Sequence, residues 1–206
     1  KGELLDSGLE FLIKIQTGSK PPVGERVLVI GGGSVAADVA INAQRLGARQ
    51  VTMACLESLK EMPAIPEDLA QVHEEGITIL PSWGPQRILE RDGQLVGIEL
   101  IRCTSVFDQD GHFAPTFDPA VTTIVEADQI LLAIGQAADL SYAGPTLRTE
   151  RGMIVTEKDT TATSLEGVFA GGDVTGGPAT LVHAMASGTK AATAIGAYLA
   201  DTPFSS

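Results

Sequence analysis

Beyond Val23, the hydrophobic pattern of the chain alternates between short apolar runs and helical periodicity. Residues 27–30 (VLVI) are continuously apolar over the length of a strand, as expected of a parallel strand buried on both faces. Over residues 35–46, apolar side chains recur every three or four positions with polar ones opposite, which predicts an amphipathic helix. A second apolar strand follows at residues 51–54. Together these segments have the length of one strand–helix–strand unit, roughly 30 residues.

The pattern continues with one more helix and strand before its character changes. Residues 67–76 (EDLAQVHEEG) predict a short helix that ends at its glycine, and residues 77–80 predict a third strand. Beyond Trp83, which we expect to pack at a strand end, apolar stretches around the Asp92-Gly93 turn predict antiparallel strands. The expected strands of this β-meander cover residues 88–90, 95–101 and 121–125. An apolar run at residues 130–134 then predicts a return to the buried sheet.

These elements divide the chain into three parts. Residues 1–23 contain an amphipathic stretch followed by glycine and prolines, and they predict a linker helix. Residues 24–135 predict a three-layer, Rossmann-like α/β domain with a β-meander in its last crossover. Residues 136–206 supply two short strands, at residues 152–155 and 168–170, and one helix from about Pro178 to Leu199, too little to bury a core of their own. We therefore expect residues 136–206 to be part of a second domain.

Composition and charge exclude several classes of function. The chain has 206 residues, with 14 Lys and Arg against 26 Asp and Glu, for a net charge of −12. Such acidity argues against nucleic-acid binding and against an anionic membrane surface. Apolar runs stay far below the roughly 18 residues of a membrane span, so no membrane segment is expected.

Cysteine and histidine usage points away from side-chain catalysis and metal binding. Cys55 and Cys103 form no C-x-x-C, zinc or iron–sulfur pattern, so redox chemistry would have to come from a bound cofactor. Two thiols in a chain of this size are typical of a reducing cytoplasm, a single disulfide being the alternative. His73, His112 and His183 lie far apart, without metal-ligand spacing or a nucleophile partner. We therefore predict no catalytic side chain and no metal site.

The strongest functional signal is a glycine motif between the first strand and its helix. Gly31-Gly32-Gly33-Ser34-Val35-Ala36 reads G-x-G-x-x-A within a strand–helix–strand unit, the context that the dinucleotide fingerprint requires. Gly31 permits a tight turn, and Gly33 allows the backbone to approach a diphosphate, which the helix N-terminus then binds. Ala36 allows close packing of the helix on the strand. The alternative is a glycine-rich turn without a ligand.

A second signal concerns which nicotinamide cofactor fits. The fingerprint expects an acidic residue about 20 positions further on, which accepts a hydrogen bond from the ribose 2′-hydroxyl. Glu57 stands at that place, just past the second strand. A carboxylate there repels the 2′-phosphate of NADP, so we predict that the chain prefers NAD to NADP. The nearby cation Lys60 is an argument for NADP. The alternative is that Glu57 is a solvated loop residue without a role in binding.

Several motifs in one order give the sequence a resemblance to a known family. The motifs are VLVIGGGSVAADVA (27–40), EMPA (61–64), ILLAIGQAADL (130–140), GVFAGGD (167–173) and GPATLVHAMASGTKAA (177–192). They resemble flavoproteins with two dinucleotide-binding domains, most closely the glutamate synthase small-subunit group, within the pyridine nucleotide-disulfide oxidoreductase-like families. That group includes the flavin module of dihydropyrimidine dehydrogenase.

The resemblance implies a set of cofactor-binding residues. It places the diphosphate of NAD(P)H on Gly31, Gly32, Gly33, Ser34 and Val35. NADPH-using members typically carry two arginines where this chain has Leu56 and Glu57, which again favours NAD. Ala133 to Gly135 correspond to the crossing back toward the flavin domain. Gly172 and Asp173 correspond to residues beside the flavin ribityl-diphosphate, and Ala179 and Thr180 to a helix start facing the isoalloxazine ring.

These observations together predict an oxidoreductase. The expected parent protein passes a hydride from NADH to FAD and electrons onward to a partner subunit or domain, with the cofactors doing the chemistry. The earlier glycine fingerprint for the ADP half of FAD is expected to lie outside this chain, as in a fragment that lacks the N-terminal FAD half. The alternative is a dinucleotide-binding module or structural subunit without turnover. Apolar surface left by an incomplete flavin domain also predicts self-association into a homo-oligomer.

Overall fold

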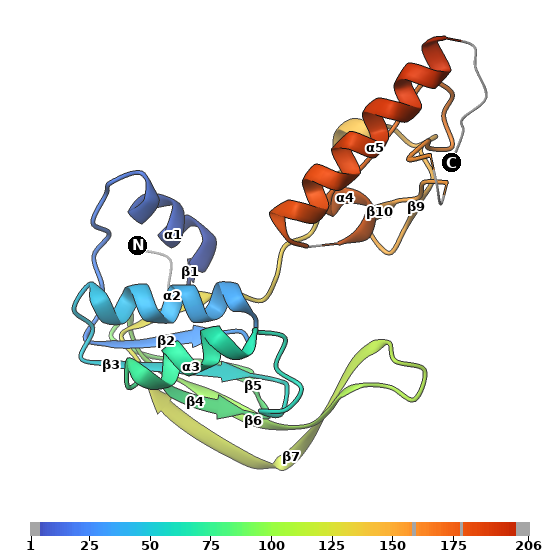
Figure 1. The fold of residues 1–206 in the computed structure, drawn as a ribbon. Helices are drawn as coiled ribbons and strands as arrows, with labels where there is room; N and C mark the ends of the chain where they lie inside the picture. The colour runs from blue at the N-terminus through green and yellow to red at the C-terminus, as the bar shows by residue number, and fades with distance from the viewer. Residues whose placement is uncertain (1–4, 158–159, 178, 201–206) are drawn as a thin grey trace. The chain divides into compact units, whose positions relative to one another are not determined.

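The computed structural model describes residues 5–157, 160–177 and 179–200, and it divides into two compact units (Figure 1). Unit 1 comprises Lys1–Gly135 and unit 2 comprises Gln136–Ser206. Unit 1 contains the glycine motif.

A five-stranded parallel sheet forms the middle layer of unit 1. Its strands are β1 (Asp6–Ser7), β8 (Gln129–Leu132), β2 (Arg26–Ile30), β3 (Gln50–Cys55) and β4 (Thr78–Pro81), in this spatial order. Neighbouring strands all pair in parallel. Four of them lie within one or two residues of the apolar runs that predicted them, whereas the two-residue β1 is too short to leave a pattern in the sequence.

Three helices cover one face of this sheet: α1 (Gly8–Gln16), α2 (Ser34–Arg45) and α3 (Pro66–Glu74). Local signals explain their bounds. The hydroxyl of Ser7 caps α1 by accepting a hydrogen bond from the Glu10 N–H at 3.3 Å. Pro66 occupies the first turn of α3, where its missing N–H costs nothing. Gly47 follows α2 with a φ of +110°, a conformation that glycine adopts without strain.

The other face of the sheet is covered by the predicted β-meander, so unit 1 has three layers. Its strands are β5 (Trp83–Arg91), β6 (Gln94–Phe107) and β7 (Phe113–Glu126), all antiparallel. Alternate residues of β2 point to opposite cores: Val27 and Val29 pack with the helices, whereas Leu28 and Ile30 pack with β6. Strand β2 is therefore apolar throughout because both its faces are buried.

The meander strands are longer than their apolar cores predict. Strands β6 and β7 each span 14 residues and continue as a hairpin beyond the sheet, seen in light green in Figure 1. The outer part mixes polar and aromatic residues and is interrupted by shifts of register, so it shows no regular apolar alternation. Trp83 begins β5, as expected, and the Arg102 guanidinium carbon lies 4.1 Å from its ring centroid.

Unit 2 is a smaller body with little regular structure besides one long helix. It contains η1 (Ser141–Ala143), β9 (Thr149–Glu150), β10 (Met153–Ile154), α4 (Asp173–Gly176) and α5 (Leu181–Leu199). The strand predicted at residues 168–170 is reduced to one bridge, between Ala162 and Phe169. Pro178, where the sequence predicted the start of the last helix, lies outside the described residues.

Helix α5 exposes a series of large apolar side chains within unit 2. The most exposed are Leu181, Val182, Met185 and Leu199, each more than 60% accessible. Among the described residues, no helix combines the length and apolar character that crossing a membrane requires.

Candidate functional site

The glycine motif lies where the carboxyl ends of three parallel strands meet. Gly31 follows β2 directly, and its N–H donates to the Ala54 carbonyl of β3 at 2.9 Å. On the other side, a Cβ added at Gly31 would lie 2.3 Å from the carbonyl oxygen of Ala133, just past β8. The φ of Gly31 is +146°. Position 31 therefore accepts only glycine, for reasons internal to the fold.

Gly32 and Gly33 differ in what surrounds them. A Cβ added at Gly32 would lie 2.9 Å from Glu57 Oε2 and 3.0 Å from Cys55 Cβ, so the chain itself fills that space. At Gly33 the nearest described atom would be Pro63 Cγ, 3.9 Å away, and the backbone has ordinary extended angles (φ −92°, ψ 175°). The fold thus tolerates a side chain at position 33. Space beside Gly33 stays open.

Helix α2 begins beside that open space. The N–H groups of Ala36 and Ala37 both donate to the Gly33 carbonyl, at 2.9 and 3.2 Å. For the N–H groups of residues 33–35, no acceptor is found within the part of the chain that the structure describes. Such a helix start carries a partial positive charge of about half a unit and can bind an anion.

Glu57 is brought to the glycine motif although it is distant in the sequence. It follows β3, the strand adjacent to β2, and the Oε2 atom is the first described atom that a Cβ at Gly32 would meet. Its backbone carbonyl accepts a hydrogen bond from the Ser82 N–H at 2.8 Å, which fixes the loop. The side chain is half-buried. A carboxylate therefore stands at the β3 side of the open space.

Ala133 and Gly135 lie on the opposite side, after β8. The Ala133 N–H donates to the Ile30 carbonyl at 2.8 Å, which extends the β2–β8 pairing up to the glycine motif. Ile134 is 72% exposed, and Gly135 has a φ of +98° that favours glycine. The structure thus gathers Gly31, Gly32, Gly33, Ser34, Val35, Glu57 and Ala133 around one edge of the sheet.

The other predicted residues belong to unit 2 and form a separate arrangement. Gly172 has a φ of +73°, and its N–H donates to the Ser187 hydroxyl of α5 at 2.9 Å. Asp173 begins the short helix α4. Thr180 caps α5, where its hydroxyl accepts from the His183 N–H and contacts His183 Nδ1 at 2.9 Å. Ala179 is exposed just before this cap.

Sequence reasoning assigned no role to the segment that contacts the glycine motif most directly. The Ala64 N–H donates to the Gly32 carbonyl at 3.1 Å, and the Ile65 N–H donates to Ser34 Oγ at 3.4 Å. The only signal was the EMPA motif, which entered as a point of resemblance. Hydrogen bonds from a loop to residues 31 or 32 positions earlier leave no periodic trace in the sequence.

The two cysteines are buried free thiols. Burial raises the pKa of the Cys55 thiol to about 12, and the neighbouring Glu57 carboxylate adds to the effect. Burial likewise raises the pKa of the Cys103 thiol. Because the thiolate is the nucleophile, neither group is placed for thiol chemistry near neutral pH.

We expect the native chain to resist alkylation at both cysteines. At pH 8, iodoacetamide should modify Cys55 and Cys103 far more slowly in the folded chain than in denaturant, because burial suppresses both access and ionisation. Mass spectrometry of timed samples measures the two rates. Modification of either residue in the folded chain as fast as in denaturant would contradict the burial described here.

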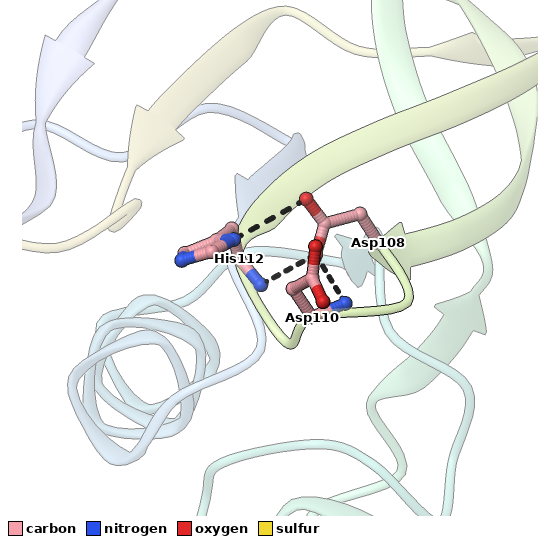
Figure 2. A group of neighbouring side chains, drawn as sticks. All are labelled: Asp108, Asp110 and His112. Carbon is pink, nitrogen blue, oxygen red and sulfur yellow. Dashed lines mark hydrogen bonds and ion pairs between the residues drawn. The ribbon is translucent and has the colours of Figure 1, made fainter.

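One further cluster of polar side chains lies at the tip of the β6–β7 hairpin. Figure 2 shows Asp108, Asp110 and His112 together there. The Asp108 Oδ1 atom accepts from the N–H groups of Asp110 (2.9 Å) and His112 (2.8 Å), while Oδ2 lies 3.4 Å from His112 Nδ1. All three residues are exposed. These hydrogen bonds account for the cluster as the closure of a turn.

Comparison with known proteins identifies the chain's relatives. The sequence matches the family described as pyridine nucleotide-disulphide oxidoreductase over residues 8–188. It is 36% identical over 195 residues to the NADP(+)-dependent formate dehydrogenase subunit beta of Moorella thermoacetica, with coverage of 93% of this chain and 28% of that protein. It is 31% identical over 188 residues to the Glutamate synthase [NADPH] small chain of Azospirillum brasilense (89% and 39% covered). It is also 31% identical over 196 residues to the NAD-dependent dihydropyrimidine dehydrogenase subunit PreT of Escherichia coli O157:H7 (95% and 42% covered).

The fold has close structural counterparts as well. Thioredoxin reductase from Lactococcus lactis aligns with a TM-score of 0.70 at 19% identity, covering 98% of this chain and 63% of that one. This likeness confirms the expected α/β class with a parallel sheet. The chain spans between 28% and 42% of the length of the three relatives above. On the family match over residues 8–188, the chain belongs to the pyridine nucleotide-disulphide oxidoreductase family.

Proposed function

We propose that unit 1 binds a nicotinamide dinucleotide, with the diphosphate against residues 31–35 at the start of α2. The observation that carries this proposal is the open space at Gly33. Gly31 is required by the chain's own packing, and a side chain at Gly32 would press on Cys55 and Glu57. At Gly33 a side chain meets nothing closer than Pro63 Cγ at 3.9 Å, so the fold does not need that glycine. A glycine that the fold does not need is best explained by a ligand that approaches the backbone.

The same arrangement suits the charge of a diphosphate. The chain is strongly acidic, with a net charge of −12, so an anionic ligand needs a local source of positive potential. The N–H groups of residues 33–35, which have no acceptor among the described residues, and the dipole of α2 supply it without a basic side chain. Backbone donors are also fixed in direction before the ligand arrives, which lowers the entropic cost of binding.

Glu57 favours NAD over NADP within this proposal. Its carboxylate stands beside Gly32 at the end of β3, on the side of the motif where an adenosine ribose would lie. A ribose with two free hydroxyls can donate hydrogen bonds to it, whereas a 2′-phosphate would be repelled. Two of the three relatives described above are named for NADP(H) and one for NAD, so on names alone NADP(H) is favoured. We nevertheless propose NAD as the preferred dinucleotide, because of the negative charge of Glu57.

The function that follows from this binding site is electron transfer. Residues 31–35 would hold the nicotinamide dinucleotide, which would supply a hydride for a flavin to accept, so that NADH is oxidised to NAD⁺ as the flavin is reduced. In unit 2, Asp173 and the start of α5 at Thr180 are the residues we assign to the flavin side. The relatives are named as subunits or as a small chain, which supports transfer of the electrons to a partner subunit.

A spectroscopic experiment tests the proposal. The purified chain is incubated with FAD, desalted, and titrated with NADH and with NADPH while the visible spectrum and nicotinamide fluorescence are recorded. We expect saturable binding of NADH that is tighter than that of NADPH. If flavin is retained, its visible band should bleach when NADH is added.

The outcomes separate the two functions that the sequence left open. Retained flavin that bleaches supports the oxidoreductase. Saturable NADH binding without retained flavin supports a dinucleotide-binding module, in which residues 136–206 are not sufficient to bind flavin. Absence of saturable binding of either dinucleotide would contradict the site at Gly33 and the proposed function with it.

A further inference from the structure

Residues 58–65, here called the latch segment, are held in place independently of the glycine motif. The Ser58 N–H and hydroxyl donate to Glu61 Oε2 at 3.3 and 2.6 Å, and the Glu61 N–H donates to the Ser58 carbonyl at 3.0 Å. These bonds close a turn and lower the pKa of the Glu61 carboxyl. Met62 is 8% exposed and packs in the core beneath α2. The latch segment is therefore anchored at both its turn and its centre.

The anchored segment is hydrogen-bonded to the glycine motif at two successive residues, with Pro63 beside them. The Ala64 N–H donates to the Gly32 carbonyl at 3.1 Å, and the Ile65 N–H to Ser34 Oγ at 3.4 Å. Pro63 supplies the atom nearest to a Cβ built at Gly33. Ala64 itself is 6% exposed, so its hydrogen bond to Gly32 is shielded from water and is correspondingly costly to break.

The direction of the Gly32 carbonyl fixes the direction of the Gly33 N–H group. In a trans peptide the C=O and the following N–H point in opposite directions because the unit is planar. The described peptide bonds around the motif are trans. With the Gly32 carbonyl turned to Ala64, the Gly33 N–H must point away from the latch segment. A flip of this peptide would instead present a carbonyl oxygen in place of the donor.

We propose that the latch segment sets the anion-binding geometry of the glycine motif, with Ala64 as the positioning residue. This inference rests on the proposed dinucleotide site and adds a part to it. Ala64 does not contact the ligand. Its N–H holds the Gly32–Gly33 peptide in the orientation that offers an N–H group to the diphosphate, and the glycines alone do not enforce that orientation because glycine rotates freely.

Substitutions at Ala64 test the role of its N–H directly. Ala64→Pro removes the donor, whereas Ala64→Gly keeps it and removes only a methyl group. We expect Ala64→Pro to weaken the binding of NADH and of ADP by the same factor, at least about ten. Both ligands carry a diphosphate, and both would lose the hydrogen bond from the Gly33 N–H to it. Ala64→Gly should bind within about threefold of the unsubstituted chain. Calorimetric titration measures both affinities, well below the thermal midpoint of each variant.

A matched control separates the lost hydrogen bond from the general effect of a proline. Leu59 is exposed at the second position of the Ser58–Glu61 turn, where proline is well tolerated, so Leu59→Pro should retain affinity. If Ala64→Pro fails to fold, the double substitution Ser58→Ala with Glu61→Ala loosens the latch through exposed or half-buried side chains. It should weaken both ligands by about fivefold while the thermal midpoint changes little.

The possible results distinguish a failure of the latch proposal from a failure of the proposed dinucleotide site. If the unsubstituted chain binds NADH and both the proline and the double variant bind equally well, the latch is wrong and the dinucleotide site stands. A fall in thermal midpoint without loss of affinity would give Ala64 a structural role only, and would also overturn the latch. If the unsubstituted chain binds neither dinucleotide, the proposed function is wrong, and the latch proposal, which depends on it, is wrong as well.

Discussion

Replacing Gly33 with valine is expected to abolish binding of NADH and NADPH in a chain that folds normally. The extended angles at position 33 suit a β-branched residue, and the nearest described atom to its Cβ is 3.9 Å away, so the fold accommodates the side chain. The added methyl groups then occupy the space that we assign to the diphosphate. We expect affinity to fall by at least about a hundredfold, which is about 2.7 kcal/mol. Fluorescence titration measures the affinity, and circular dichroism confirms the fold.

Gly31→Ala is the matched control, because it adds a side chain two residues earlier in the same motif. There we expect the substitution to destabilise the fold rather than to block the ligand. Its Cβ would lie 2.3 Å from the Ala133 carbonyl oxygen, so the thermal midpoint should fall markedly. The comparison distinguishes a glycine kept for folding from one kept for a ligand. Equal affinity in Gly33→Val and the unsubstituted chain would remove the central support for the proposed function.

Replacing both Leu56 and Glu57 with arginine is expected to shift the preference toward NADPH. The substitution exchanges a carboxylate beside Gly32 for two guanidinium groups, which attract and can clasp a 2′-phosphate. Opposite charges a few ångströms apart at a partly solvated site are worth over a kcal/mol, so the ratio of dissociation constants, NADPH over NADH, should fall by at least about tenfold. Titration of each variant with both nucleotides gives the ratio.

The control for this charge change is Glu74→Arg. Glu74 ends α3, and since α3 runs antiparallel to the parallel strands, this residue lies at the sheet edge remote from the glycine motif. Its replacement alters the net charge without altering the site, so the ratio should hold within about twofold. A ratio that stays constant in the double-arginine variant would show that Glu57 does not select the nucleotide. An unsubstituted chain that prefers NADPH would show the same, in agreement with the names of two relatives.

Local signals were sufficient for most of unit 1. The run of apolar residues in β2 predicted a strand buried on both faces, and the structure places Val29 in the helix-side core and Leu28 in the meander-side core. The Asp92-Gly93 turn was found where it was expected, with both residues at positive φ. In unit 2 the same method failed at residues 168–170, where a short apolar run forms only one bridge, because a strand needs a partner that sequence periodicity does not reveal.

The glycine motif shows where the limit lies. From the sequence, the order of the fingerprint alone assigns Gly31 to the turn and Gly33 to the approach of a diphosphate, and it gives no physical cause that separates Gly32 from them. The structure separates them by their surroundings, since Ala133 crowds the first, Cys55 and Glu57 crowd the second, and the third faces open space. Those neighbours come from other strands, so they become neighbours only when the sheet has formed.

The sequence by itself determined the helices of unit 1, four of the five strands of its parallel sheet, the position of the glycine turn and the acid that follows the next strand. Each of these depends on the periodicity or the conformational freedom of consecutive residues. Tertiary structure decided which glycine is left without a neighbour, how far the meander extends, and that Ala64 and Ile65 donate hydrogen bonds to the glycine motif. These depend on contacts between residues distant in sequence. The physical reason is that a hydrogen bond such as Ala64 to Gly32 constrains orientation without imposing any residue type, since every residue except proline offers the same N–H.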